Sequence, residues 1–346
     1  MTNRIELKWD IPYEVDEQHY YCSETPIDPE NLPVPKVVLA GDVRTYVDTE
    51  IEIGKTYYVA VGSVKNGVEK ISDEKLILFG KEWTPTTLTN SMYFDADSVV
   101  VVDGKVASIS SKNGSHIFTQ NTVNYRPVLV TNTLNNQPIM RFTKANKSNL
   151  STENALDYLK NVSYAWVFAV YKRNDVATLA TTNALFIASV NGSTSGRFSV
   201  YAGTSDSVAN SNKFGFGVRG LDSQGSLSTA YGLASESTEW CMSLAYNNYT
   251  MANGQAFFNG SKVFDGALST SGTTSNTPSS SMNIGMEGDT AYNDGHLNGD
   301  IAAIIIGNFE LTESNRQKLE GWAAHKYGLT ANLPAGHPYK ILVPTL

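Results

Sequence analysis

Short apolar segments separated by turn residues dominate this chain, and they leave little room for any fold not built from β-strands. The segments are rich in β-branched and aromatic residues, which favour strands, and Ser, Thr, Asn and Gly fill the stretches between them. More than ten such segments lie between residues 92 and 310, including SYAWVFAVY at 163–171 and DIAAIII at 300–306. One open sheet of that many strands would expose long edges, so we predict two packed sheets.

One segment departs from this pattern, because its apolar positions change to helical spacing after Thr312. The expected helix face consists of Leu319, Trp322, Ala323 and Tyr327. Thr312 suits the N-cap, and Gly328 suits the left-handed residue that ends a helix. Burial stabilises a fold by about 1.5–3 kcal/mol per large apolar side chain, so we predict that this helix packs against the strands as a clasp.

The first 80 residues have the same β character but a different charge. Asn66-Gly67 predicts a tight hairpin, since this pair readily adopts the positive φ angles of such a turn. Four prolines between residues 26 and 35 predict an extended crossing loop. Residues 1–82 carry 16 acidic and 9 basic residues, a net charge of −7, whereas residues 83–346 carry a net charge of −1. This asymmetry favours two modules.

The first module resembles a fibronectin type III or related immunoglobulin-like domain. The resemblance rests on YYCSETPIDPENLP and on VRTYVDTEIEIGKTYYVAVGSVKNGVEKIS, and it covers about residues 3–80 of the domain predicted at residues 1–80. The variant that it looks like is often found at the front of bacteriophage tail and virion-surface proteins. The resemblance implies that Tyr57 or Tyr58 occupies the tyrosine corner of such a domain.

Residues 81–91 are polar and predict a linker, and residues 331–346 predict an extended C-terminal tail. Between them, residues 92–330 resemble the concanavalin A-like, laminin-G-type jelly rolls of phage tail and adhesin proteins. The segments FDADSVVVVDGKVASIS and GDIAAIIIGNFELTESNRQKLEGWAAHKYGL carry this resemblance, which implies a closing strand followed by one packed helix. The predicted fold class is all-β: an immunoglobulin-like sandwich, then a concanavalin A-like jelly-roll sandwich closed by one C-terminal α-helix.

The sequence contains no complete catalytic motif of the kinds considered below. Residues 192–196, GSTSG, lack the central serine of a nucleophile elbow, and the five histidines include no pair at metal-ligand spacing. Glycosidases of similar sandwich architecture carry Glu-x-Asp-x-Glu on one strand, whereas residues 14–18 read EVDEQ and end in Gln18 in the wrong module. We therefore expect no enzyme; a glycan-degrading enzyme is the less favoured alternative.

The loop at residues 285–299, GMEGDTAYNDGHLNG, is the best candidate for a binding site. Its candidate ligand-binding residues are Asp289, Tyr292, Asn293 and Asp294. Asp289 and Asp294 offer hard oxygens suited to calcium, and Tyr292 offers a flat face for a sugar ring. A solvated connecting loop is the alternative interpretation, and we predict no other cofactor.

These features together indicate a non-enzymatic phage virion-surface protein that adsorbs to host-surface or environmental glycans. Both a receptor-binding tail fibre and a capsid decoration or head fibre fit, and a purely structural virion protein remains the alternative. We expect residues 1–82 to contact other virion proteins, and any trimer to form through domain faces or through partners. The net charge of −8 argues against nucleic acid, and the sequence shows neither a signal peptide nor a membrane span. Synthesis in the host cytoplasm and a place on the virion surface are therefore expected.

Overall fold

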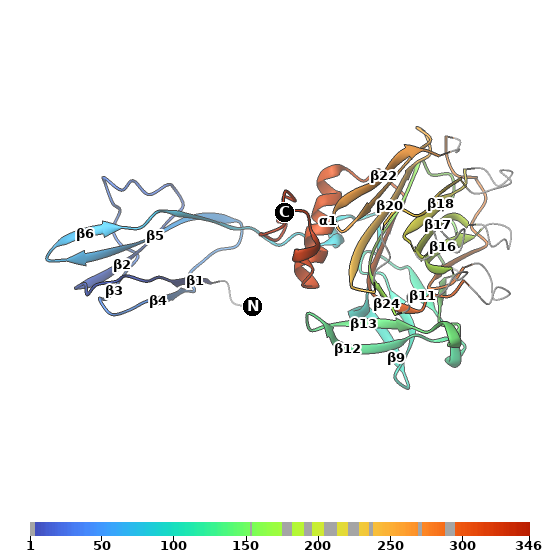
Figure 1. Ribbon diagram of the computed structural model, residues 1–346, viewed down its shortest axis with the longest axis horizontal. Helices are drawn as coiled ribbons and strands as arrows, with labels where there is room; N and C mark the ends of the chain where they lie inside the picture. The colour runs from blue at the N-terminus through green and yellow to red at the C-terminus, as the bar shows by residue number, and fades with distance from the viewer. Residues whose placement is uncertain are drawn as a thin grey trace. The chain divides into compact units, whose positions relative to one another are not determined.

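The computed structural model describes residues 4–152, 154–174, 182–189, 196–203, 213–220, 228–234, 238–268, 272–287 and 295–346. The chain divides into two compact units, one made of residues 1–82 and 345–346 and one of residues 83–344. Antiparallel strands build both units, and the one α-helix of the described residues lies near the C-terminus (Figure 1). The predicted all-β class with one C-terminal helix is confirmed.

The first unit has two antiparallel sheets. Its strands are β1 (Ile5–Lys8), β2 (Glu17–Ser23), β3 (Val37–Ala40), β4 (Thr45–Asp48), β5 (Lys55–Lys65), β6 (Val68–Ile71) and β7 (Lys75–Phe79). β1 pairs with β4, while β2 and β3 pair with each other and β5 pairs with β2, β6 and β7. The β5–β6 hairpin turns at Asn66 and Gly67, whose φ angles of 52° and 76° fit the predicted tight turn. Buried Ile5, Tyr20 and Tyr57 join the two sheets in one core.

The second unit contains the remaining strands. They are β8 (Met92–Asp95), β9 (Val99–Val102), β10 (Lys105–Ser110), β11 (Ile117–Thr119), β12 (Val128–Leu134), β13 (Gln137–Phe142), β14 (Leu150–Thr152), β15 (Tyr164–Arg173), β16 (Asn183–Ser189), β17 (Gly196–Gly203), β18 (Gly215–Val218), β19 (Ser228–Ala230), β20 (Cys241–Asn248), β21 (Asn253–Phe258), β22 (Ser261–Ala267), β23 (Ser281–Ile284) and β24 (Gly299–Gly307). The α-helix, α1 (Glu313–Lys326), follows β24.

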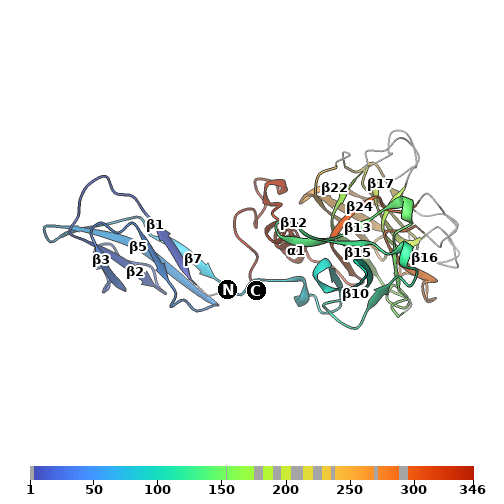
Figure 2. The same ribbon diagram turned by 90° about the horizontal axis from the view of Figure 1, so that it is seen from below.

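These strands form two sheets in a sandwich. The helix-side sheet runs β22-β21-β20-β15-β24, and β8 and β13 both pair with the far edge of β24. Figure 2 shows β13, β24 and β15 side by side. The opposite sheet runs β19-β18-β17-β16-β23-β14. Strand β10 pairs with β9, β11 and β12, and so joins the two sheets along one side.

Strands β15 and β24 are buried on both faces. In β15, Ala165, Val167 and Ala169 belong to the core between the sheets, whereas Trp166 and Phe168 belong to the core beneath α1. A strand exposes alternate side chains on opposite faces, so two apolar layers require the nearly continuous apolar sequence of these strands. Strand β15 accordingly lies in the interior of the helix-side sheet, between β20 and β24.

The exit of the chain from β24 is fixed by Trp166 of β15. Its indole lies against Gly307, where an added Cβ would come within 2.0 Å of the ring. The indole N–H donates to the carbonyl oxygen of Phe309 at 3.0 Å, and the two rings meet edge to face. One buried side chain therefore sets the direction of the turn that leads to the helix.

The helix α1 covers the outer face of the helix-side sheet. The Thr312 hydroxyl caps it by accepting from the Asn315 N–H at 3.3 Å, and Gly328 follows it with a φ angle of 69°. Its buried apolar residues are Leu319, Trp322, Ala323 and Ala324, and Tyr327 joins the same cluster directly after it. The Trp322 ring meets Tyr93 edge to face at 5.4 Å. The helix therefore has the clasp role that its sequence predicts.

The segments predicted as a linker and as a tail take part in the packing. Trp83 and Leu88 are buried in the cluster beneath α1, because the chain enters the second unit earlier than its polar composition suggests. In the C-terminal segment, a 3-10 turn at Thr330–Asn332 precedes Leu333, which is buried in the same cluster. The final residues 345–346 return to the first unit, where Thr345 pairs with Glu82.

Replacing Trp322 by alanine should destabilise the second unit. Loss of a buried tryptophan side chain costs about 3–5 kcal/mol, because its contacts disappear and a cavity remains. Urea unfolding of the full chain, followed by tryptophan fluorescence and far-ultraviolet circular dichroism, measures the loss. Ser314→Ala, at an exposed position of the same helix, is the matched control. Equal midpoints for the two variants would contradict the clasp role of α1.

Candidate functional site

The predicted ligand-binding residues Asp289, Tyr292, Asn293 and Asp294 fall within 288–294 and so lie outside the described residues. The two ends of the loop are described. Met286 pairs with His296, and the Glu287 N–H donates to the Gly295 carbonyl oxygen at 3.0 Å. Gly285 has a φ angle of 80°, and an added Cβ would meet the Phe142 ring at 2.4 Å, so this position requires glycine. The calcium and sugar roles of the loop stay predictions.

The glycosidase-like residues 14–18 are not arranged as a pair of catalytic acids. Glu17 and Gln18 begin β2 in the first unit, and Gln18 is fully buried, where it accepts from the Ser63 hydroxyl at 2.9 Å. Glu17 instead lies 3.3 Å from a ring nitrogen of His19. Among the residues that the structure describes, no cluster of three or more His, Cys, Asp or Glu side chains could hold a metal ion.

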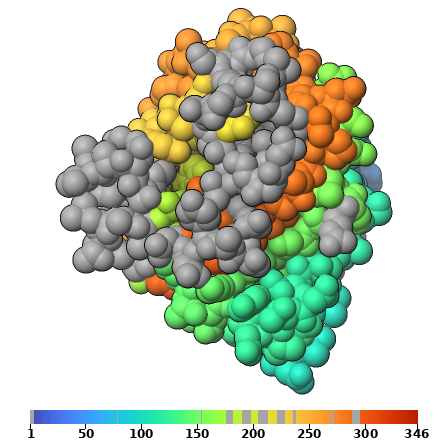
Figure 3. Space-filling view, turned by 90° about the vertical axis from the view of Figure 1, so that its right-hand side faces the viewer, coloured from blue at the N-terminus to red at the C-terminus, as the bar shows by residue number. Residues whose placement is uncertain are grey.

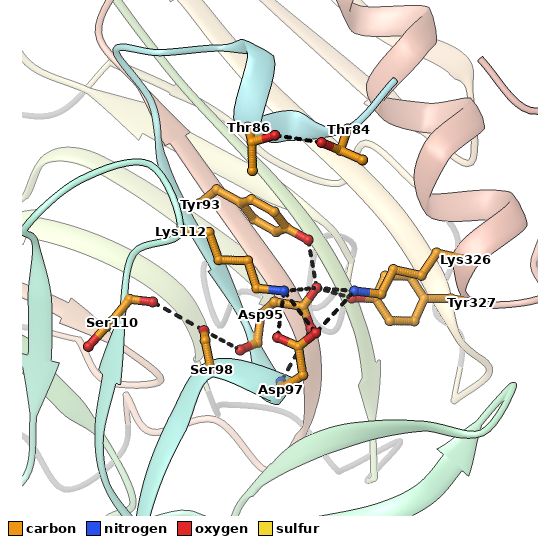
Figure 4. Close-up of polar contacts among 10 residues, drawn as sticks. All are labelled: Thr84, Thr86, Tyr93, Asp95, Asp97, Ser98, Ser110, Lys112, Lys326 and Tyr327. Carbon is orange, nitrogen blue, oxygen red and sulfur yellow. Dashed lines mark hydrogen bonds and ion pairs between the residues drawn. The ribbon is translucent and has the colours of Figure 1, made fainter. Parts of the chain in front are cut away.

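Asp95 and Asp97 belong to an ionic cluster that ties α1 to the first strand of the second unit (Figure 4). Asp95 is fully buried, and one of its carboxylate oxygens accepts from the Tyr93 hydroxyl at 2.7 Å, from the Tyr327 hydroxyl at 3.1 Å and from the Lys326 ammonium. The Lys112 ammonium lies 2.6 Å from Asp97 and 3.8 Å from Asp95. Two carboxylates thus face two ammonium groups.

The cluster is satisfied internally. Burial, together with the Asp95 carboxylate, raises the pKa of both tyrosine hydroxyls, so they remain protonated and act as donors. The second oxygen of Asp95 faces the Asp97 N–H at 3.4 Å. Since both oxygens of the buried carboxylate have partners within the protein, we assign this cluster to holding the C-terminal end of α1 rather than to binding a substrate.

A groove of about 370 Å³ lies at the other end of α1 and is the best candidate site in the described residues. We call it the helix-side groove. It is lined by Leu244, Tyr246, Asn248, Met251, Asn253, Gln255, Phe257, Lys262, Glu310, Leu311, Thr312, Glu313 and Arg316. Strands β20, β21 and β22 supply its floor, and the start of α1 supplies one wall; Figure 1 shows α1 beside these strands.

Strand register places the polar groups of this groove in rows. Tyr246 pairs with Gln255, which pairs with Asp265, and Asn248 pairs with Asn253. Because alternate residues of a strand share a face, Asn253 and Gln255 point to the same side as Tyr246, while Gly254 and Ala256 lie on the buried side. This alternation is visible in the sequence and is the signal that our sequence interpretation did not use.

In each amide side chain of the groove, either the oxygen or the nitrogen makes a hydrogen bond to another group of the protein. The Asn253 and Gln255 amide nitrogens donate to the Asp265 carboxylate, each at 3.2 Å. The Asn248 side-chain oxygen accepts from the Met251 N–H at 3.0 Å. The other end of each amide has no partner among the residues described, so the groove presents two carbonyl oxygens and one NH₂ group in set orientations.

Both cations of the groove are paired with carboxylates. The Lys262 ammonium lies 2.8 Å from Asp265, and its hydrogen bond lowers the pKa of that carboxyl. The Arg316 guanidinium, 7% exposed, lies 2.5 Å from Glu313 and 2.5 Å from Glu320, and it stacks 4.0 Å from the centre of the Phe257 ring. Neither cation is left to attract an anionic ligand.

Aromatic surface completes the groove. The half-buried ring of Tyr246 lines the groove, and it lies 6.2 Å from the ring of Tyr164 at an angle of 33°. Burial raises the pKa of Tyr246, so its hydroxyl stays neutral. A half-buried tyrosine face beside oriented amides can contact the CH groups of a ring while hydrogen-bonding its hydroxyls. The arrangement therefore suits a neutral, hydroxyl-rich ligand.

Comparison with known proteins gives fold likeness only. No family model and no curated protein matches the chain. Among solved structures, it is similar to the K499G mutant of NanB sialidase from Streptococcus pneumoniae, with 15% identity and a TM-score of 0.41 over 51% of this chain and 26% of that one. The chain thus spans about a quarter of the length of that sialidase.

Two carbohydrate-binding structures are also similar. The CBM40 of Ruminococcus gnavus IT-sialidase, bound to alpha2,3 sialyllactose, has 13% identity and a TM-score of 0.35 over 44% of this chain and 80% of that one. Domain 4 of AbnA, an arabinanase from Geobacillus stearothermophilus in complex with arabinotriose, has 12% identity and a TM-score of 0.37 over 66% of this chain and 97% of that one. At these values the likeness extends to neither ligand nor activity.

Replacing Asp95 by alanine should cost about 3–5 kcal/mol of unfolding free energy, because it leaves the Lys326 charge without its buried partner. Asp97→Ala, at a side chain that is 38% exposed, should cost less than about 1 kcal/mol. Chemical denaturation of both variants measures the difference. Similar losses for the two would mean that Asp95 does not carry the joint between α1 and β8.

Proposed function

We propose that the second unit binds neutral glycans in the helix-side groove, and that the chain is a non-enzymatic phage virion-surface protein that uses this binding for adsorption. The three half-satisfied amides beside Tyr246 are the observation that carries the glycan part of this proposal. A sugar hydroxyl is both donor and acceptor, so it fits the free NH₂ group of Asn248 as well as the free oxygens of Asn253 and Gln255.

The virion part of the proposal rests on sequence resemblance and on the first unit. Tyr57 is buried there, and its hydroxyl accepts from the Glu52 N–H at 3.0 Å, five residues upstream. A tyrosine bonded back to an upstream backbone group is a feature of immunoglobulin-like domains, and it favours the resemblance to the front modules of virion proteins. The net charge of −7 on residues 1–82 suits a basic docking surface on another virion protein.

A glycan array probed with the full-length chain tests the binding. Tyr246→Ala should weaken the interaction with a retained glycan by about three- to tenfold, since an aromatic contact contributes about 0.5–1.5 kcal/mol. Gln255→Ala should weaken it as well. Tyr13→Ala, at a 53% exposed tyrosine of the first unit, is the matched control. Absence of any retained glycan for the unmutated protein would favour the purely structural alternative.

Deletion of residues 1–82 should prevent incorporation into virus particles if the first unit is the attachment end. The second unit has its own cores and should stay folded, as judged by circular dichroism. Quantitative immunoblotting of purified particles measures incorporation against the full-length chain. Normal incorporation of the truncated chain would place the attachment surface in the second unit.

A further inference from the structure

A second groove, of about 310 Å³, lies between two 3-10 turns of the second unit, η3 (Val123–Tyr125) and η4 (Lys144–Asn146). We call it the two-turn groove. It is lined by Lys105, Asn124, Tyr125, Ala145, Asn146 and Lys147. The segment around residues 100–130, teal in Figure 3, forms one end of the second unit. The groove shares no lining residue with the helix-side groove.

Asn149, only 2% exposed, fixes both walls of the two-turn groove. Its backbone N–H donates to the Tyr125 carbonyl oxygen at 3.0 Å, and its side-chain NH₂ donates to the Lys147 carbonyl oxygen at 2.9 Å. Its side-chain oxygen accepts from the Gln120 amide at 2.8 Å. A buried amide thus ties η3 to η4, so the groove exists before any ligand arrives.

The lining of this groove, as far as the structure describes it, is rich in donors and contains no carboxylate. Among the described residues, the side chains of Asn124, Tyr125, Asn146 and Lys147 have neither a hydrogen-bond nor an ion-pair partner. Lys105 donates to the Val123 carbonyl oxygen at 3.3 Å, and its charge has no acidic partner within the same described set. Two uncompensated ammonium groups and several free donors therefore surround one cavity.

The backbone at Lys147 gives an independent indication. Its φ angle is 51°, in the left-handed region where lysine is uncommon and glycine or asparagine is the usual residue. Lys147 is the C-cap residue of η4, and it lines the groove. Residues held in such sparsely populated conformations gather at binding sites.

We propose that the two-turn groove binds an oxyanion, the carboxylate or phosphate group of an acidic glycan. Ammonium groups and neutral N–H and O–H donors form charge-assisted hydrogen bonds with such a group. The helix-side groove differs, because its Lys262 and Arg316 already face carboxylates. That the oxyanion belongs to a glycan rests on the proposed function, whereas the oxyanion site itself rests on the donor set and on the backbone at Lys147.

Titration of the full-length chain with glucuronate, glucose 6-phosphate and glucose, followed by nuclear magnetic resonance, tests the proposal. We expect at least one anionic sugar to bind about tenfold tighter than glucose, and this preference to weaken in 0.5 M salt. The stronger of the two anionic probes identifies carboxylate or phosphate as the preferred group.

The double variant Lys105→Gln, Lys147→Asn should lower the affinity for the anionic probe about tenfold. Asparagine fits the left-handed position, so the turn is preserved while the charge is removed. Lys105→Gln alone should lower the affinity less, and Lys160→Gln, a lysine outside both grooves, should leave it unchanged. Equal affinity for glucose and both anionic sugars, or an unchanged affinity in the double variant, would overturn the proposal.

The binding predictions for the two grooves can be contradicted independently of each other. Tyr246→Ala should weaken neutral glycan binding and leave the affinity for the anionic probe intact, and the double lysine variant should do the reverse. If the array shows no neutral glycan but the anionic probe still binds and depends on Lys105 and Lys147, the oxyanion site stands without the proposed function. Loss of the anionic signal in Tyr246→Ala would place that probe in the helix-side groove and overturn the assignment.

Discussion

The burial of β15 and β24 on both faces is the constraint on which the second unit depends. One face of each strand is covered by the opposite sheet, and the other by α1 with Trp83, Leu88 and Leu333. The helix has 14 residues and a length of about 21 Å, and the sheet extends past its first turn. Beyond Glu313 the outer face of the sheet changes from apolar to polar, and the helix-side groove begins there. The groove therefore lies where α1 stops covering the outer face of the sheet.

The two grooves illustrate how charge pairing decides the kind of ligand. Lys262 and Arg316 are as cationic as Lys105 and Lys147, but the first pair is neutralised by carboxylates built into the same surface. Among the residues that the structure describes, the only partner of the second pair is the backbone carbonyl bonded to Lys105. Counting lysines in the sequence does not separate these cases, because what differs is whether a carboxylate three or four residues away lies within ion-pairing distance of the cation.

Periodicity alone predicted much of the architecture. The helix face, its Thr312 cap, the Gly328 stop and the buried strand at 300–306 all follow from local spacing. Other features depend on contacts between distant segments. The buried carboxylate of Glu320 lies 3.1 Å from His337 in the C-terminal segment, and Asp95 meets Lys326 only after the fold forms, 231 residues along the chain. Trp83 lies in a segment that is polar by composition, and its burial depends on the core that α1 closes.

Trp166 positions the start of the helix but is not among the residues that line the groove beside it. Its indole holds the Phe309 carbonyl and lies flat on Gly307, so the wall of the groove is positioned from within the core. The amides that line the groove lie on β20 and β21, and Tyr246 of β20 pairs with Trp166. Under the proposed function, substitutions at Asn248, Asn253 and Gln255 would change what the groove binds and leave the contacts of Trp166 in place. The lining of the groove and the packing that positions its wall thus depend on different residues.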